Sequence, residues 1–457
     1  MNHKMMIKHC RSIGIFMMLV LTVGLLHAKS DQVPAPPQTQ PIALVGGTIH
    51  PLSGAPIENG TILFEKGKIT AIGKDITLPA DTKIIRVEGK HVYPAFIEAA
   101  STLGLSEVGA MAVTNDYREL GVNNANVRAE VAVNPDSEHF PVARADGIAL
   151  AGTLPSGGLI AGRGALIELD GWTWEDMTLK APLCVVINYP NVTVSSGRRR
   201  FGPPVSKAEQ RKRIARQLAS LDTFFEEARA YKKAIEAAGK KGAAFHKFDA
   251  RWDALLPVLN GTVPVWVNAN ERKQIESAVD WADRQGIKMV LLGGADAHQV
   301  TELLKRKNIP VIIRTVLRQP SRRDEGFDLP YTLPLKLHQA GIKYCIAGGG
   351  NWNVRMLPHQ AAKAASYGLP VEEAMKSVSL YVAEIMGVAD RVGSLESGKD
   401  ATLMIANGNP LEFTTTIERL FIEGRDIDMN NRHKTLHQKY MTKYRQRNAL
   451  ERVKNEE

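Results

Sequence analysis

Residues 93–102 read Tyr-Pro-Ala-Phe-Ile-Glu-Ala-Ala-Ser-Thr. The apolar run after the proline predicts a β-strand, and Glu98 places one acidic residue within it. Ala100 and Thr102 follow at the end of the strand. An alanine cannot bind a metal ion, and a lone threonine hydroxyl is a poor ligand. This stretch therefore predicts a β-strand that ends without a good metal-ligating side chain.

Outward from this strand, short apolar segments alternate with helical segments, which is the pattern of a (β/α) barrel. The candidate strands are residues 92–97, 147–151, 183–188, 263–267, 288–292, 309–314 and 342–347. The candidate helices are residues 207–239, 271–284, 297–306, 333–340, 359–367 and 371–386. Ser206, with Glu209 three residues later, predicts a capped start for the first helix. Residues 100–182 are less regular and predict long loops over the active face.

Short β segments occupy both ends of the chain, outside the alternating region. Glycine-containing turns separate the apolar or β-branched runs, which predicts a small β domain. The runs are residues 42–45, 61–64, 68–72 and 83–87 near the N-terminus, and 402–405 and 417–423 near the C-terminus.

Both ends of this arrangement match a known pattern. Residues 391–401 read Arg-Val-Gly-Ser-Leu-Glu-Ser-Gly-Lys-Asp-Ala. They resemble the C-terminal signature G-S-L-E-x-G-K-x-A-D-L of the amidohydrolase superfamily, and residues 93–102 resemble its first barrel strand, P-G-x-I-D-x-H-x-H. The resemblance covers residues 41–427, and the chain looks like an exported imidazolonepropionase-like amidohydrolase. It implies an α/β fold with a TIM-like (β/α)8 barrel and a composite β-sandwich from both chain ends. The implied family activity is hydrolysis of C–N bonds other than ordinary peptide bonds.

Under this interpretation the chain divides into six segments. They are a signal peptide (1–28), a flexible leader (29–40), the first part of the β-sandwich (41–90), the barrel (91–388), the second part of the sandwich (389–427) and a polar helical tail (428–457). The signal peptide follows from a basic start, an uncharged apolar run at residues 13–26 and the small residue Ala28. It predicts an exported protein, periplasmic or secreted, with no membrane attachment after cleavage. An uncleaved N-terminal anchor is the alternative.

The net charge bears on whether the protein binds nucleic acid, and the cysteines bear on whether it contains a disulfide. Loss of residues 1–28 would remove three basic residues and no acidic one, which lowers the net charge from +10 to +7. The basic runs are typical of solvated faces, so nucleic acid is not a predicted partner. Cys184 and Cys345 each lie in an apolar run and are interpreted as two buried free thiols, with one disulfide as the alternative.

The resemblance also implies where a metal would be bound. The usual family ligands are a His-x-His pair on strand one, histidines after strands five and six, and an aspartate after strand eight. Together they hold zinc or another divalent metal. No metal and no other cofactor is expected in this chain, because the corresponding positions are Ala100, Thr102, Asn268, Gly293 and Gly350. His433 and His437 have i, i+4 spacing in the tail and are interpreted as surface histidines.

Polar residues nevertheless follow several predicted strands. The candidates for ligand binding are Ser101, Asn268, Asn270, Asn351 and Arg355. Glu98 and Glu107 are the candidate catalytic residues. Such a cluster could bind a small ligand through hydrogen bonds, or it could be the polar filling of an abandoned site.

Two functions remain open. The first is a non-catalytic subunit that holds a small cyclic amide or peptide-like ligand, or that pairs with an intact amidohydrolase or with a second copy of itself. The alternative is an active hydrolase with an altered or metal-free site, in which Glu98 or Glu107 acts as the base. The sequence contains no phosphate loop, nucleophile elbow or dinucleotide-binding fingerprint.

Overall fold

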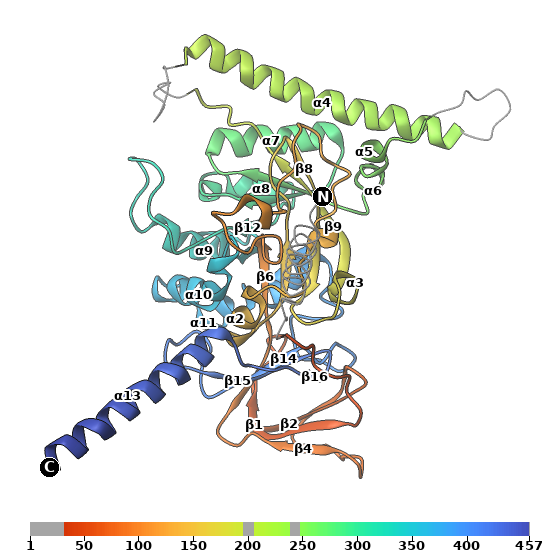
Figure 1. Cartoon of the computed structure of the whole chain (residues 1–457). Helices are drawn as coiled ribbons and strands as arrows, with labels where there is room; N and C mark the ends of the chain where they lie inside the picture. Colours follow the sequence, from red (N-terminus) through yellow and green to blue (C-terminus); the bar gives the residue numbers. More distant parts are fainter. Residues whose placement is uncertain (1–31, 195–204, 238–246, 457) are drawn as a thin grey trace, which may run out of the picture. The chain divides into compact units, whose positions relative to one another are not determined.

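The computed structural model describes residues 32–194, 205–237 and 247–456 (Figure 1). The predicted signal peptide lies outside the described residues. The features below belong to one compact unit, Pro34–Glu457. Within the described ranges, no helix has the length and apolar character needed to cross a membrane.

Eight strands form one sheet that curves into a nearly closed barrel. Their order is β13-β12-β11-β10-β9-β8-β7-β6. The strands are β6 (Phe96–Ser101), β7 (Ile148–Thr153), β8 (Ile160–Glu168), β9 (Thr178–Asn188), β10 (Val265–Ala269), β11 (Met289–Gly293), β12 (Val311–Ile313) and β13 (Tyr344–Ile346). Each of the seven predicted barrel segments overlaps one of them. Every residue of β6, β7, β11, β12 and β13 is buried, as expected for a sheet covered on both faces.

Strand β8 interrupts the predicted (β/α) alternation. It pairs antiparallel with both β7 and β9, whereas the other neighbouring strands of this sheet are parallel. Between β8 and β9 the chain makes only the short helix α3 (Trp174–Met177). Gly162 and Gly164 lie within β8, and interior glycines weaken the sequence signal of a strand. A Cβ at Gly164 would lie 2.5 Å from a side-chain carbon of Leu154, so close packing explains that glycine.

Helices form the connections between the parallel strands from β9 to β13. Ser206 and Glu209 form the predicted reciprocal cap of α4: Ser206 Oγ accepts from the Glu209 N–H at 3.1 Å, and Glu209 Oε2 accepts from the Ser206 N–H at 3.2 Å. The helices of these connections are α4 (Lys207–Ala237), α5 (Ala250–Asp253), α6 (Leu256–Leu259), α7 (Arg272–Gln285), α8 (Thr301–Arg306) and α9 (Leu329–Gln339), and those after β13 are α10 (Leu357–Ser366), α11 (Val371–Lys376) and α12 (Leu380–Met386).

The predicted helix over residues 371–386 is divided into α11 and α12 for a reason that lies elsewhere in the fold. The Ile346 N–H on β13 donates to the Ser377 carbonyl at 2.9 Å, and the Ile97 N–H on β6 donates to the Val378 carbonyl at 2.9 Å. These carbonyls leave the helical ladder in order to bridge the two edge strands. We call this junction of β6 and β13 the seam of the barrel.

A second sheet is built from both ends of the described chain. Its order is β16-β15-β14-β5-β1-β2-β3, with β4 paired to β1. Antiparallel pairing of β5 with β14 joins the N-terminal strands to the C-terminal ones. The strands are β1 (Ile42–Ile49), β2 (Ile57–Glu65), β3 (Lys68–Gly73), β4 (Lys83–Arg86), β5 (His91–Pro94), β14 (Leu403–Ala406), β15 (Ile417–Ile422) and β16 (Arg425–Asp426).

This second sheet folds around a core of its own. Phe64 on β2 packs edge-to-face against Phe421 on β15, with ring centroids 5.2 Å apart. In the sheet order, β14, β5 and β1 lie between these two strands. The sheet must therefore curl so that distant strands face each other across a dry interior.

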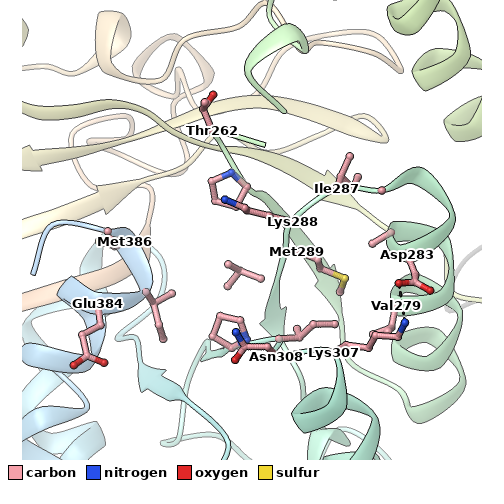
Figure 2. A pocket seen from close by; sticks show the side chains of 18 of the residues that line it. Thr262, Val279, Asp283, Ile287, Lys288, Met289, Lys307, Asn308, Glu384 and Met386 are labelled. Carbon is pink, nitrogen blue, oxygen red and sulfur yellow. Dashed lines mark hydrogen bonds and ion pairs between the residues drawn. The ribbon is translucent and has the colours of Figure 1, made fainter. Parts of the chain in front are cut away.

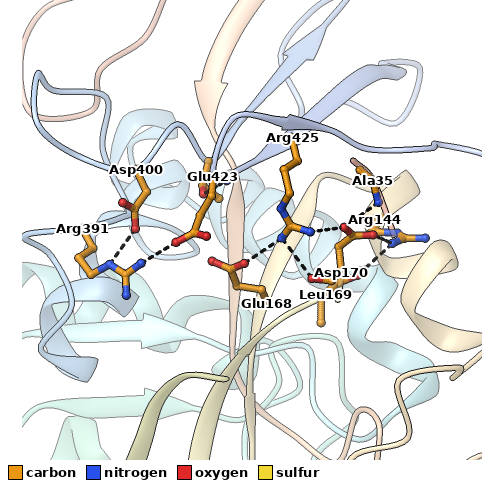
Figure 3. A network of polar contacts seen from close by, with 10 residues as sticks. Ala35, Arg144, Glu168, Leu169, Asp170, Arg391, Asp400, Glu423 and Arg425 are labelled. Carbon is orange, nitrogen blue, oxygen red and sulfur yellow. Dashed lines mark hydrogen bonds and ion pairs between the residues drawn. The ribbon is translucent and has the colours of Figure 1, made fainter. Parts of the chain in front are cut away.

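Buried charges connect the barrel sheet to the second sheet (Figure 3). Arg425 on β16 donates to Glu168 at 3.1 Å and to Asp170 at 2.5 Å, just beyond the end of β8. Arg144, from helix α2 (His139–Ala145), donates to Asp170 at 2.7 Å. Glu168 and Asp170 are nearly inaccessible to solvent. The junction therefore depends on cations that neutralise two buried carboxyl groups.

Glu168 is the most perturbed member of this network. Burial raises its pKa to about 8, the neighbouring Glu423 adds to the increase, and Arg425 opposes it. Among the described residues, Glu168 Oε1 has no hydrogen-bond partner. Near neutral pH the Glu168 carboxyl is therefore mostly protonated, and its hydrogen bond from Arg425 becomes stronger when the group ionises.

The last helix, α13 (Arg432–Glu456), is exposed over the part whose side chains the structure describes. Every side chain from residue 432 to 448 is exposed. His433 and His437 are among these exposed residues, as the sequence interpretation predicted.

Both cysteines of the described chain are buried free thiols, in agreement with the prediction. Cys184 lies on β9 and Cys345 on β13, and three strands of the barrel sheet separate these two. The alternative of a disulfide is therefore wrong for this structure.

Candidate functional site

The carboxyl ends of the parallel barrel strands form the face where barrel enzymes place their chemistry. In this chain that face carries Glu98 from β6, Asn188 from β9, Asn268 and Asn270 from the end of β10, and Arg314 directly after β12. These groups are three amides and two side chains of opposite charge, Glu98 and Arg314, rather than a set of histidines.

Glu98 is fully buried at the seam of the barrel. Its Oε1 accepts from the Ala100 N–H at 2.9 Å on its own strand, and its Oε2 accepts from the Gly348 N–H at 2.6 Å beyond β13. A Cβ at Gly348 would lie 2.8 Å from Oε2, so the glycine leaves room for the carboxylate. The Glu98 side chain thus joins the two edge strands, close to the positions that the Ser377 and Val378 carbonyls bridge.

The protonation of Glu98 reflects opposing influences. Burial raises the pKa of this carboxyl to about 7, while the backbone N–H groups and the positive charge of Arg314 lower it. Both oxygens are already engaged by the backbone. The group is therefore able to change charge near neutral pH, but it does not project freely into a substrate space.

The positions that correspond to the family's metal ligands do not provide a donor set. Ala100 and Gly350 have no donor side chain, and the Thr102 N–H simply donates to the Gly350 carbonyl at 3.1 Å across the seam. At Gly293, a Cβ would lie 2.5 Å from Asn270 Oδ1, so Asn270 occupies the space of a side chain at this position. The described residues contain no group of three or more His, Cys, Asp or Glu side chains arranged to hold a metal ion. The residues present therefore do not fit the divalent metal of the family.

Asn268 is the one amide side chain at those positions, and it takes part in an amide array. Its Nδ2 donates to Asn188 Oδ1 at 3.3 Å, and Asn188 Nδ2 donates to the Gly158 carbonyl at 3.1 Å. Asn268 Oδ1 is buried and has no partner among the described protein atoms. A buried acceptor without a donor is costly unless a ligand or water satisfies it.

The structure does not bring the other predicted site residues together with this array. Ser101 Oγ donates to the Gly152 carbonyl at 3.2 Å, inside the barrel wall. Asn351 Nδ2 donates to the Ser106 carbonyl at 2.9 Å and holds the loop after β6. Glu107 accepts from Asn134 at 3.4 Å on that loop. Arg355 is exposed, and its positive charge lowers the pKa of Asp146. Asp146 precedes β7 and so lies at the amino end of that strand, not at its carboxyl end.

Arg314 was not among the predicted site residues. The predicted strand over residues 309–314 did end on it, so a lone arginine after an apolar strand was the available signal. With Asn270, Gly293, Thr315 and Arg318 it lines a cavity of about 120 Å³, whose remaining wall is apolar. This cavity lies at the ends of β10, β11 and β12.

A larger cavity, about 620 Å³, lies at the opposite end of the same strands (Figure 2). Its walls include Lys288 before β11, Asn308 before β12 and Met386 at the end of α12. The Lys307–Asp283 ion pair, 2.8 Å between Nζ and Oδ1, crosses one side of it. Residues at the amino ends of barrel strands usually serve stability rather than chemistry, so size alone does not make this cavity the active site.

Comparison with known proteins places this geometry in context. No protein-family model matches the chain. Amidohydrolase tasK of Hapsidospora irregularis is 21% identical over 387 residues, which cover 80% of this chain but only 39% of that protein's length. An amidohydrolase structure from Thermotoga maritima is 25% identical with a TM-score of 0.74, covering 85% of this chain and 99% of the other. Molinate hydrolase is 16% identical with a TM-score of 0.53, covering 86% of this chain and 95% of the other, and it supports the fold alone.

Proposed function

We infer that this chain is a barrel of the amidohydrolase superfamily that binds a small cyclic amide or peptide-like ligand without metal-dependent hydrolysis. The family assignment is supported by the likeness to amidohydrolase tasK and to the Thermotoga maritima amidohydrolase. The loss of hydrolysis is a proposal about this chain, and so are its substrates and partners.

The observation that carries the proposal is the chemistry at the ends of the strands. Metal-dependent hydrolysis needs several nitrogen or carboxylate donors around one ion and a base beside its bound water. Ala100, Gly293 and Gly350 offer no donor, and the buried amide of Asn268 has an unused acceptor that suits an N–H group. Amide ligands carry both an N–H donor and a carbonyl acceptor, which match the donors and acceptors of asparagine.

The first test is metal content together with hydrolysis. Protein produced with added zinc is expected to contain less than about 0.1 equivalent of metal, because tight binding requires a full set of ligands. Elemental analysis measures the metal, and a cyclic amide such as hydantoin serves as the assay substrate. The His433→Ala/His437→Ala variant is the control, because it removes the exposed pair on α13 that could bind zinc outside the barrel. Stoichiometric metal in this variant, with hydrolysis abolished by a chelator and restored by zinc, would refute the proposal.

A metal-free hydrolase is a second candidate, and one observation favours it. The pKa of Glu98 is raised to about 7 by burial, which suits a general base that works near neutral pH. If Glu98 is the base, Glu98→Gln abolishes turnover of the cyclic amide and Glu107→Gln does not. If Glu107, on the loop, is the base, the loss of turnover occurs in Glu107→Gln instead. Unchanged rates in both variants would exclude this candidate.

We further propose that the protein is exported to the periplasm or secreted, and that it forms a homo-oligomer or pairs with an intact amidohydrolase. Export rests on residues 1–28, outside the described residues. Mass spectrometry of the protein recovered outside the cytoplasm would reveal whether the mature chain begins after Ala28. A full-length mass would contradict cleavage there.

A further inference from the structure

The small cavity at the mouth of the barrel has a charge that the rest of the site does not use. Arg314 follows β12, is exposed, and lines the cavity. Within the described ranges it forms no ion pair and no side-chain hydrogen bond. Its nearest charged influence is Glu98, whose oxygens are already bonded to the Ala100 and Gly348 N–H groups.

The other arginine of the cavity is neutralised by a partner. Arg318 donates to the buried carboxylate of Glu325 and to the Gln319 carbonyl. Although burial acts to raise it, hydrogen bonds from Arg318 and Ser321 lower the pKa of Glu325 to about 2. Glu325 is therefore ionised and compensates Arg318, which leaves Arg314 as the cavity's uncompensated positive charge.

The backbone around Arg314 is held in place. Gln360 on α10 is buried, and its Oε1 accepts from the Val316 and Leu317 N–H groups at 2.7 Å each. The Thr315 hydroxyl donates to the same oxygen at 3.2 Å. The turn that presents the guanidinium is thus rigid, and a rigid binding group loses less entropy when a ligand binds.

The cavity walls match one kind of ligand. Arg314 and Asn270 offer side-chain donors to the cavity, and Ile313, Pro330 and Leu333 are part of its apolar lining. A guanidinium binds a carboxylate through two parallel N–H donors, which a single point charge cannot reproduce. The cavity of about 120 Å³ has room for only a few non-hydrogen atoms.

We propose that this cavity binds the carboxylate group of a small organic acid, or the acid end of a larger peptide-like ligand, with Arg314 as its cationic partner. The inference rests on the proposed function, since it adds a substrate class to the same binding barrel. The acid end of the ligand lies against Arg314.

Ligand-observed NMR titrations with acetate and acetamide test the proposal, because the two probes have the same shape and differ in charge. Acetate is expected to bind with a Kd of about 1–10 mM, a range set by its small size, and acetamide at least about tenfold more weakly. Arg314→Gln is expected to weaken acetate binding at least about tenfold, since it removes a charged hydrogen-bond partner. Arg314→Lys retains the charge and is expected to lose part of the affinity. Arg323→Gln, which removes the same charge from a neighbouring exposed position, is the control and leaves acetate binding unchanged.

Several outcomes would overturn the carboxylate site. One is that acetate and acetamide bind with equal affinity, and another is that chloride or phosphate displaces acetate as effectively as acetate itself does. The others are unchanged acetate binding in Arg314→Gln and no acetate binding up to about 50 mM. If the protein lacked acetate binding and was also metal-free and inactive, only this inference would fail. Metal-dependent hydrolysis of a cyclic amide would refute the proposed function, and the measured acetate affinity would still test the carboxylate site independently.

Discussion

Replacement of Arg425 by methionine is expected to lower the free energy of unfolding by about 3–5 kcal/mol. Arg425 bonds to both Glu168 and Asp170, and its side chain is only 17% exposed. Methionine preserves much of the apolar stem but leaves two buried carboxyl groups with one fewer cation. The midpoint of urea-induced unfolding, compared with wild type at pH 8, measures the loss.

The same substitution at Arg419 is the matched control. Arg419 pairs with Asp426 at 2.9 Å, but both side chains are more than a third exposed. Exposed pairs contribute about 0–1 kcal/mol, so Arg419→Met should change the unfolding midpoint little. Equal losses in the two variants would contradict the importance assigned to the buried junction.

Glu168 determines the pH dependence of this effect. Its pKa is about 8 in the folded protein, raised by burial above the ordinary value of a glutamate. As the pH rises from about 5 to 8, the unfolded chain releases this proton first, so the free energy of unfolding decreases and then levels above pH 8. Addition of Glu168→Gln to Arg425→Met removes the ionisable group and is expected to restore part of the stability at pH 8. No recovery in the double variant would show that Glu168 is not the source of the loss.

Replacement of Glu98 by alanine is the second change with a large expected effect. It leaves the buried Ala100 and Gly348 N–H groups without their acceptor, and each unsatisfied group costs about 1–3 kcal/mol. The expected loss is about 2–5 kcal/mol in the free energy of unfolding, measured by urea at pH 7. Glu98→Gln keeps one acceptor oxygen and should lose about half as much. Glu107→Gln, on the partly exposed loop, is the control and should stay within about 0.5 kcal/mol of wild type.

The pH profile separates a role at the seam from a merely local packing effect. Because burial raises the folded pKa of Glu98 to about 7, its proton is retained longer in the folded state than in the unfolded chain. Its contribution to stability is therefore present at low pH and is lost as the pH rises from about 5 through 7. Glu98→Gln should flatten the stability profile in this interval, and a profile identical to that of wild type would contradict the assignment.

The sequence predicted the barrel strands because buried parallel strands are continuous apolar runs, as in residues 289–292 and 344–347. It did not predict β8, since Gly162 and Gly164 dilute the strand signal while close packing against Leu154 requires them. The sequence also did not predict the break between α11 and α12. It depends on N–H groups of Ile97 and Ile346, which are distant in sequence and adjacent only in the closed barrel.

For the candidate site, the sequence identifies the residues at the family's metal-ligand positions but does not show the contacts that the site residues make. Ala100, Gly293 and Gly350 can be compared with a family pattern position by position. The cavity beside Arg314 cannot, because it depends on Glu325 compensating one arginine and on no carboxylate reaching the other. Glu98 was recognised as a candidate base, but the sequence does not show that its oxygens are engaged by the backbone of two strands.

The two-ended construction of the second sheet bears on how the chain is made. Strand β5 ends at Pro94, and the strand that covers its edge, β14, begins at Leu403. During synthesis from the N-terminus, more than three hundred residues must follow before that edge has a partner. An unpaired edge of this kind promotes aggregation, and long-range pairing slows folding. Maturation of this protein therefore depends on keeping an incomplete sheet apart from other chains until its last strands emerge.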